Sequence, residues 1–253
     1  MRLEKRKVVF FRRKMPQIEW ALSSNIGSRP INEDSVLALE DDGRFLFVVA
    51  DGLGGHGMGQ EAANTVTQAF VDEFSKNKGS NFLMEAFEKA QQAVLDAQDS
   101  KNLRNQMKTT ATALYVEGGK FSYGHIGDTR LYHFRDDRLV VRTKDHSVSQ
   151  LLVSAGEINE EDIASHPDRS RLVYVIGDKW DTPKYEIIKP KTIKNGYCFL
   201  ICTDGMWEIL PNPKPPNNQN ANRWLWGLVA QIRKESEENK NIDNYSAIAV
   251  LVR

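Results

Sequence analysis

The stretch FLFVVADGLGGHGMG, residues 45–59, decides the fold of this 253-residue chain. Its first six residues, 45–50, are all apolar, which is typical of a strand that is buried on both faces. Asp51 follows at once, and the glycine-rich loop 52–59 comes next. A carboxylate at the end of a buried strand is costly unless a cation or hydrogen-bond donors meet it. The stretch therefore predicts a central strand that delivers Asp51 to a functional edge of a sheet.

Other carboxylates stand in the same way at the start or end of short, mainly apolar runs. They are Glu33, Asp34, Asp128, Asp204 and Asp243. In two stacked antiparallel sheets, the ends of rising strands and the starts of falling strands share one rim. Carboxylates crowded on that rim repel one another unless cations lie among them. The pattern therefore predicts a site for hard divalent cations, and a metal site on a rim indicates catalysis.

The order of strand and helix signals predicts an α+β fold. We expect strands near residues 17–21, 35–39, 44–50, 110–116, 120–126, 130–134, 139–142, 185–188 and 197–202, and helices near 60–76, 82–97 and 223–234. Short turns join several of the strands, so the sheets should be mainly antiparallel and covered by helices. Asn222 is the expected cap of the last helix, after an irregular loop at 211–222.

The chain divides into a basic N-terminal extension, residues 1–16, and one domain, residues 17–253, interrupted by a flap-like insertion at 147–178. The extension is expected to be a solvated leader or an edge strand, with docking to a partner as the alternative. Lysine and arginine total 34, as do aspartate and glutamate, so no net charge favours nucleic acid or an acidic membrane. We expect a monomer.

Cellular location is indicated by two features. No apolar stretch is long enough to span a bilayer. The only cysteines, Cys198 and Cys202, share one predicted strand, where positions four apart are more than ~13 Å from each other and cannot bridge. Both should face the core. Cytoplasmic location is therefore the expectation.

The carboxylates and their neighbours suggest phosphate chemistry. Asp51 could bridge two ions, and Gly52 would let a backbone carbonyl approach one of them. Oxygen ligands alone favour Mg²⁺, Mn²⁺ or Ca²⁺ over zinc, and two such ions can activate a water and clamp a phosphoryl group. Arg29, five residues before Asp34, is suited to bidentate phosphate binding, with a surface ion pair as the alternative. The loop at 52–59 lacks the spacing of a nucleotide-binding loop.

Six motifs in order carry a family resemblance. They are Arg29-Pro-Ile-Asn-Glu-Asp34, Asp51-Gly-Leu-Gly-Gly-His56, Gly127-Asp-Thr-Arg130, Asp145-His-Ser147, Thr203-Asp-Gly-Met-Trp207 and Asp243-Asn244. With them the chain resembles the metal-dependent protein serine/threonine phosphatases of the PPM type (type 2C) over nearly its whole length. The motif that begins at Asp51 is similar to the bacterial variant.

The resemblance implies a four-layer αββα sandwich, with helices on both outer faces of two mainly antiparallel sheets. It also implies a centre of two Mn²⁺ or Mg²⁺ ions and a third, weaker site. In the core site, the resemblance implies a bridging ligand at Asp51, a carbonyl ligand at Gly52 and further ligands at Asp204 and Asp243. Glu33 and Asp34 are implied as ligands that bind directly or through water. Asp128 and Asp204 are implied as third-site ligands, and Arg29 as the phosphate-binding residue. The insertion with Ser147, Gly156 and His166 resembles the family's flap.

The reaction implied by the resemblance is attack of a metal-bridging hydroxide on the phosphorus of a phosphoserine or phosphothreonine, without a phosphoenzyme. The leaving oxygen needs a proton. Animal members carry a histidine where this chain has Leu53, so His56 is the substitute donor, with a loop histidine that holds a turn as the alternative. Residues 173–177 depart from the family's usual pattern, which leaves flap contacts and substrate choice open.

An active phosphatase that opposes a serine/threonine kinase is the predicted function. A pseudophosphatase that keeps the fold for binding is one alternative, and the complete set of acidic ligands favours activity against it. A phosphatase of small phosphate esters is another alternative, because Arg29 and the metals recognise only the phosphate.

Overall fold

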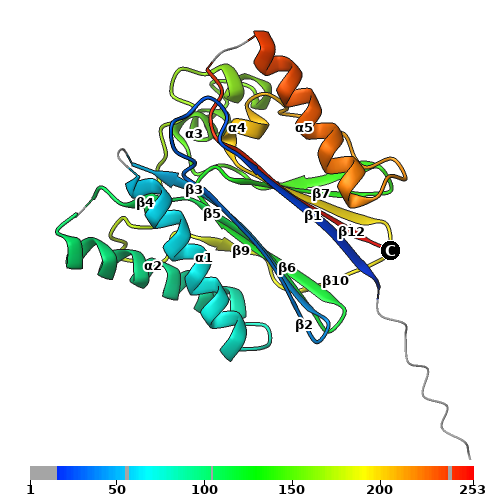
Figure 1. Cartoon of the computed structure of the whole chain (residues 1–253), viewed down its shortest axis with the longest axis horizontal. Helices are drawn as coiled ribbons and strands as arrows, with labels where there is room; N and C mark the ends of the chain where they lie inside the picture. The colour runs from blue at the N-terminus through cyan, green and yellow to red at the C-terminus, as the bar shows by residue number, and fades with distance from the viewer. Residues whose placement is uncertain (1–15, 55–56, 104, 239–240) are drawn as a thin grey trace, which may run out of the picture.

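Two antiparallel sheets stacked face to face form the centre of the protein (Figure 1). The computed structural model describes residues 16–54, 57–103, 105–238 and 241–253. The first sheet has the order β1 (Ile18–Asn25), β12 (Tyr245–Val252), β11 (Tyr197–Cys202), β7 (Arg130–Arg135), β8 (Arg138–Arg142). The second has the order β10 (Lys191–Thr192), β6 (Lys120–Ile126), β5 (Ala111–Glu117), β3 (Arg44–Leu53), β2 (Asp34–Asp41), while β4 (Lys108–Thr109) pairs with β3 and β9 (Glu186–Ile187) with β6.

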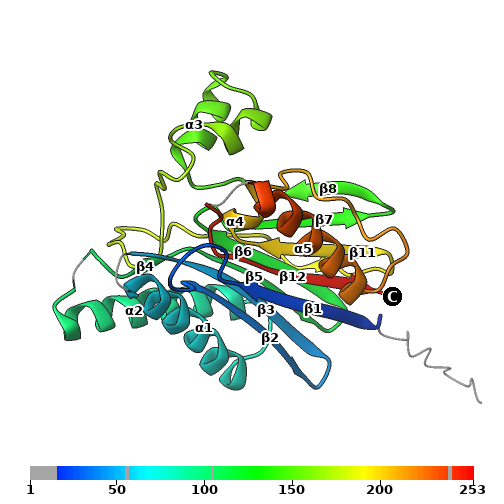
Figure 2. The same ribbon diagram turned by 45° about the horizontal axis from the view of Figure 1, so that its top comes forward.

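Helices cover both outer faces of this pair of sheets (Figures 1 and 2). On the second sheet lie α1 (Met58–Lys76) and α2 (Phe82–Lys101), and on the first lie α5 (Ala221–Glu238) and the short α4 (Asp204–Trp207). The expected αββα sandwich is therefore confirmed. The expected basic extension, apart from its last residue, lies outside the described residues.

Strand β3 shows why the apolar stretch decides the fold. Its side chains alternate between two apolar layers because successive residues of a strand point to opposite faces. Phe47 and Val49 pack between the sheets, and Leu46 and Val48 pack under α1 and α2. All four side chains are fully buried. A third apolar layer lies under α5 and contains Cys202, with the partly buried Cys198 beside it. Both cysteines are free thiols that face this layer, as predicted.

The first turn of α5 differs from the sequence prediction. The helix begins at Ala221, and Asn220 Oδ1 accepts the Arg223 backbone N–H at 2.8 Å, so the prediction of an Asn222 cap is wrong. The helix begins earlier than predicted because of a tertiary contact. The Ala221 backbone N–H donates to Glu19 Oε1 at 2.8 Å, which ties the helix start to β1.

Within the predicted insertion at 147–178, the part that carries the helices stands away from the sheets, at the top of Figure 2, while Ile176 returns to the second sheet and pairs with Thr109. It contains α3 (Val148–Ala155) and η1 (Glu160–Ser165). Ser147 caps α3 by accepting the Gln150 backbone N–H at 3.3 Å, and Gly156 ends it in a left-handed conformation. His166 follows η1, and its Nδ1 accepts the Asp168 backbone N–H at 3.1 Å. The His166 ring thus holds the backbone turn that follows η1.

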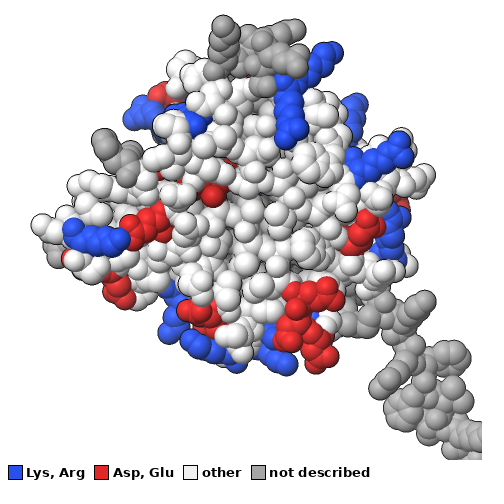
Figure 3. Space-filling model, in the orientation of Figure 1, with Lys and Arg blue, Asp and Glu red and all other residues white. Residues whose placement is uncertain are grey.

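Charged side chains of both signs are interspersed around the edge of the face shown in Figure 3. This distribution agrees with the net charge of zero. Among the helices of the described ranges, none has the length and apolar character that crossing a bilayer requires.

Candidate metal centre

The predicted carboxylates meet at one rim of the sandwich. Antiparallel register places Asp34 of β2 directly opposite Asp51 of β3. Asp204 begins α4 just after β11, and the Asp51 and Asp204 carboxyls lie close enough to share a hydrogen bond. Asp128 is near enough to both to repel them. The structure therefore gathers carboxylates from segments that are far apart along the chain.

Two further acidic groups complete the cluster. Asp243 precedes β12 and repels the carboxylates of Glu33, Asp34 and Asp204. Glu33 precedes β2, and its backbone carbonyl accepts the Gly52 N–H at 3.1 Å. All six predicted acidic residues thus belong to one electrostatic unit.

Burial and mutual repulsion raise the pKa values of this cluster. Burial is the main cause of a pKa of about 7 for Asp34, and repulsion by Asp204 adds to it. Burial likewise raises the pKa of Asp204 to about 6. For Asp51 and Asp128 the pKa lies well above the ordinary value, from burial first and then from neighbouring carboxylates. Each raised pKa means that the ionised carboxylate is unfavourable at this rim unless cations compensate its charge.

The oxygen atoms at the rim fit divalent cations. Glu33 Oε1 and Asp34 Oδ1 are buried and have no hydrogen-bond partner within the described structure. Buried carboxylate oxygens normally find donors, so these two are available to a metal ion. An all-oxygen set of carboxylates and a backbone carbonyl is the set that Mg²⁺ and Mn²⁺ prefer.

These pKa shifts predict how stability depends on pH when metal is removed. In excess chelator, the free energy of unfolding should fall as pH rises from 3.8 to about 7, because folded Asp34 keeps a proton that unfolded Asp34 has lost. Urea denaturation across this range measures the effect. Asp34→Asn should flatten the slope, whereas Asp42→Asn, in an exposed turn, should not. An unchanged slope in Asp34→Asn would contradict the assignment.

Two threonines hold the Asp51 peptide in place. The Asp51 backbone N–H donates to Thr110 Oγ1 at 3.1 Å. Its carbonyl accepts from the Thr110 backbone N–H at 2.9 Å and from Thr109 Oγ1 at 2.7 Å. Ile176, in the segment that departs from the family pattern, exchanges both backbone hydrogen bonds with Thr109. Both threonines were missed as partners of Asp51, and the pair Thr109-Thr110 at the start of the predicted strand 110–116 was the available signal.

Two glycines of the loop at 52–59 are needed because their backbones approach each other closely. A Cβ atom on Gly52 would lie 2.1 Å from the Gly59 carbonyl oxygen, and one on Gly59 would lie 2.9 Å from Glu33 Oε1. The loop therefore folds back against the end of β3 and starts α1 beside Glu33. There the Gly59 and Gln60 backbone partly offsets the rise in the pKa of the Glu33 carboxyl that burial causes.

Arg29 lies at the edge of the cluster on a loop that Asn244 secures. Asn244 Nδ2 donates to the carbonyls of Ile26 and Ile31 at 2.7 and 3.0 Å, and its Oδ1 accepts the Glu33 N–H at 2.8 Å. Arg29 Nη2 donates to Asp243 Oδ2 at 2.6 Å, and about half of the arginine side chain, 51%, is exposed. The guanidinium is thus beside the carboxylates and open to solvent.

A buried ion pair supports Asp128. Arg130 donates to both carboxylate oxygens of Asp145 at 2.8 and 2.6 Å, and its guanidinium carbon lies 3.5 Å from the Trp207 ring centroid. The Trp207 indole N–H donates to the Asp128 carbonyl at 2.9 Å. These contacts join the Asp128 turn and helix α4 to Asp145, which lies just before the predicted insertion.

The predicted proton donor, His56, lies outside the described residues. Leu53 is the last residue of β3 and pairs with Lys108 of β4. Its side chain cannot donate a proton.

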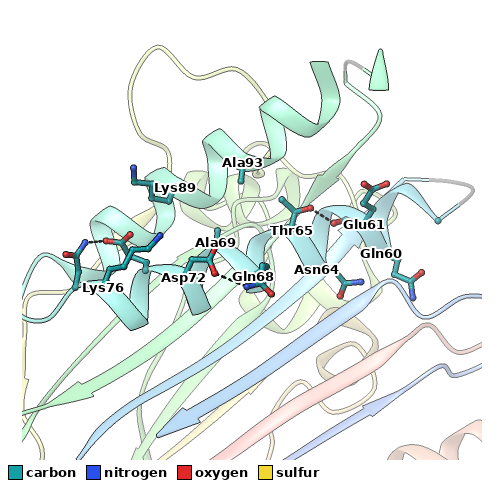
Figure 4. A pocket seen from close by; sticks show the side chains of 13 residues that line it. Gln60, Glu61, Asn64, Thr65, Gln68, Ala69, Asp72, Lys76, Lys89 and Ala93 are labelled. Atoms are coloured by element: carbon teal, nitrogen blue, oxygen red, sulfur yellow. Dashed lines mark hydrogen bonds between the residues drawn. The ribbon is translucent and has the colours of Figure 1, made fainter. Parts of the chain in front are cut away.

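A groove of about 990 Å³ lies elsewhere, along α1 and α2 (Figure 4). Polar side chains of α1 dominate its lining, among them Asn64, Gln68 and Asp72. None of the clustered carboxylates lines it, so it is separate from the rim.

This protein combines two stacked sheets covered by helices with an acidic rim and an adjacent arginine. These features define a class of metal-dependent proteins that act on phosphate groups. The family profile described as "Protein phosphatase 2C" matches residues 23–243, and the chain belongs to this family.

Relatives and solved structures agree with the family. The chain is 33% identical over 181 residues to the serine/threonine protein phosphatase PstP of Mycobacterium tuberculosis, which covers 70% of this chain but only 34% of that protein. It is 25% identical over 202 residues to the serine/threonine phosphatase stp of Listeria innocua, covering 77% of this chain and 79% of stp. The chain thus spans about a third of PstP and most of stp.

The fold is also shared with solved structures. The crystal structure of the M. tuberculosis phosphatase PstP/Ppp matches with a TM-score of 0.81 and 26% identity, over 93% of this chain and 99% of the other. The PstP catalytic domain in complex with two manganese ions matches with a TM-score of 0.78 and 24% identity, over 93% and 98%.

Proposed function

We propose that this protein is a metal-dependent phosphatase that hydrolyses phosphoserine and phosphothreonine in proteins. One observation carries the proposal: carboxylates of raised pKa, two of which have a buried oxygen with no partner among the described residues, surround a rim beside an exposed arginine. Membership of the protein phosphatase 2C family supports it, as do the names of its relatives.

The acidic residues would hold the ions in the following roles. Asp51 would bridge two ions, the Gly52 carbonyl would bind one of them, Asp204 and Asp243 would complete one coordination sphere, and Glu33 and Asp34 would bind directly or through water. Asp128 with Asp204 would hold a third, weaker ion. Mn²⁺ is the proposed metal, with Mg²⁺ as the alternative. Bound divalent ions would supply an acidified water as nucleophile and offset phosphoryl charge.

The remaining steps belong to side chains of this protein. Arg29 would donate paired N–H bonds to the phosphate oxygens, and its loop is held at the rim by Asn244. His56 is the proposed donor of the proton that the leaving serine or threonine oxygen needs. Leu53, at the position of the histidine in animal relatives, leaves that task to another group.

The 147–178 insertion is proposed as the flap that contacts the substrate. Its two ends are joined at the base, where the Val148 N–H donates to the Arg171 carbonyl and the Val173 N–H donates to the His146 carbonyl, at 2.9 and 2.7 Å. A segment that projects from such a closed base can present its surface to a protein substrate near the rim. We also propose a serine/threonine kinase as the functional opponent, a monomer, and cytoplasmic location, the last in accord with the two free thiols.

The direct test is hydrolysis of a phosphothreonine peptide. We expect turnover with Mn²⁺, loss of turnover with EDTA and recovery when Mn²⁺ is restored, because the carboxylates need cations to bind a phosphate dianion among them. Phosphate release measures the rate, and a small aryl phosphate in parallel tests preference for the peptide. Equal rates in EDTA and Mn²⁺ would overturn the metal mechanism, and a rate on the aryl phosphate alone would overturn the protein substrate.

Asp128→Ala tests the third ion. We expect two tightly bound ions to remain and kcat to fall about tenfold or more, because the charge of Asp128 beside Asp204 would hold the third ion and not the two core ions. Metal analysis and kinetics on the peptide measure the two effects. Asp137→Ala, in the exposed β7–β8 turn, is the control. A kcat equal to that of the parent protein would remove any role for a third ion.

A further inference from the structure

A cluster of two histidines and a glutamate lies apart from the acidic rim. His125 of β6 and Glu186 of β9 are direct partners in antiparallel register, so their side chains emerge on the same face. His146 comes from the base of the 147–178 insertion, and its ring centroid lies 4.8 Å from that of His125. One ligand atom from each residue can be chosen so that all three lie within 4.8 Å of one another.

His125 has one ring nitrogen that is free to act as a ligand. The residue is 3% exposed, and its Nε2 lies 2.9 Å from the Lys144 carbonyl oxygen. A carbonyl only accepts, so Nε2 carries the ring proton and Nδ1 is unprotonated. Nδ1 is buried and has no hydrogen-bond partner within the described structure. A metal-binding histidine usually donates the N–H of its other ring nitrogen to a backbone carbonyl or carboxylate, as His125 does here.

His146 and Glu186 supply two more ligand atoms. His146 Nε2 lies 3.6 Å from Glu186 Oε1, close to the ~3.4 Å that separates two ligands of one tetrahedral zinc ion. The His146 side chain is 8% exposed and that of Glu186 is 69% exposed. The glutamate can therefore adjust its position, and solvent can reach a fourth coordination position beside it.

The groups around these three residues include some that favour metal binding and some that oppose it. Burial lowers the pKa of both imidazoles, that of His146 to about 4, so both rings are neutral ligands at neutral pH. The nearby Asp145 carboxylate is already paired with Arg130 and Arg142. His146 Nδ1 accepts a long hydrogen bond of 3.3 Å from the Gly127 N–H. Metal binding at Nε2 would break this bond, because the ring proton would then be on Nδ1. Affinity should therefore be below that of a zinc site without this competition.

We propose that His125, His146 and Glu186 form a separate site for a transition-metal ion, with Zn²⁺ as the preferred occupant. Two imidazoles and one carboxylate favour zinc over the hard ions that suit the acidic rim. The ion would link β6, β9 and the base of the insertion, since the His146 backbone bonds to the Gly127 carbonyl and the Val173 N–H. This site does not depend on the proposed phosphatase activity.

Zinc binding in an Asp51→Asn background with excess Mg²⁺ tests the proposal, because both conditions weaken zinc binding at the acidic rim. Calorimetric titration of the whole chain should show one Zn²⁺ equivalent, and zinc X-ray absorption should show two imidazole ligands. Glu186→Gln and His146→Gln should each weaken this binding at least about tenfold. His166→Gln, at the far end of the insertion, should leave it unchanged.

The zinc-binding results for the two variants decide whether this site exists. Glu186 is exposed, so Glu186→Gln should fold even if His146→Gln does not, which circular dichroism checks for both. Zinc affinity that is equal in the parent background and in Glu186→Gln and His146→Gln would overturn the site. So would the absence of zinc binding, or an absorption spectrum with oxygen ligands only.

Discussion

Asp51→Asn is expected to lower kcat/KM for a phosphothreonine peptide by at least about 10³-fold. The Asp51 carboxyl lies close enough to those of Asp34, Asp128 and Asp204 to be repelled by them, and it is the proposed bridge between two ions. Loss of one bridging charge removes several kcal/mol of stabilisation of the transferring phosphoryl group, and each ~1.4 kcal/mol is a factor of ten in rate. Asparagine keeps the size of the side chain, so the change tests charge and ligation rather than packing.

Kinetics and metal content measured on the same samples decide this prediction. We expect Asp51→Asn to fold normally by circular dichroism and to retain less Mn²⁺ after gel filtration than the parent protein. Removal of one carboxylate should also ease the repulsion that raises the pKa of its neighbours, so the unloaded variant should not be less stable. Asp137→Asn, in the exposed β7–β8 turn, is the matched control. Parent-like activity and metal content in Asp51→Asn would refute the bridging role.

Asp145→Asn is expected to lower the free energy of unfolding by about 3 kcal/mol. The Arg130–Asp145 pair is almost fully buried, with 4% and 1% of the two side chains exposed. Breaking a buried pair by neutralising one partner typically costs about 3–5 kcal/mol, and asparagine retains one acceptor for the guanidinium, which places the loss at the lower end. For a domain of this size the loss corresponds to a fall in Tm of about 6–12 °C.

Chemical denaturation and thermal melting measure this loss. Asp168→Asn is the control, because Asp168 pairs with Arg171 on the surface, where 37% and 68% of the side chains are exposed. That substitution should cost less than about 1 kcal/mol. The double variant Arg130→Met with Asp145→Asn should recover part of the stability, since it removes the uncompensated charge. A Tm for Asp145→Asn equal to that of the Asp168→Asn control would show that the buried pair is not stabilising.

Much of the fold could be predicted from local patterns. The run at 45–50 indicated a buried strand, and the structure buries its alternate side chains in two different apolar layers. The helices near 60–76 and 82–97 were predicted from apolar residues on one face, and their real ends lie within a few residues. The start of α5 could not be predicted, because a contact with Glu19 of β1 selects Asn220 over Asn222 as the cap.

The candidate site was only partly predictable. The acidic residues and Arg29 stand in recognisable motifs, so their identities were available from the sequence. The threonines that hold the Asp51 peptide lie 58 and 59 residues away, and Asn244 lies 211 residues from Glu33. The cluster of His125, His146 and Glu186 was likewise hidden, since strand register and the course of the insertion bring its members together.

The sequence by itself determined most of the segments that form strands and helices, because burial leaves a local period of two or of 3.6 residues. It also showed that acidic residues stand at strand ends. Only the tertiary structure decided which carboxylates face one another and how strongly their pKa values rise. Desolvation and Coulomb repulsion depend on distances between β2, β3, β11, β12 and the Asp128 turn, and those distances exist only once the two sheets have stacked.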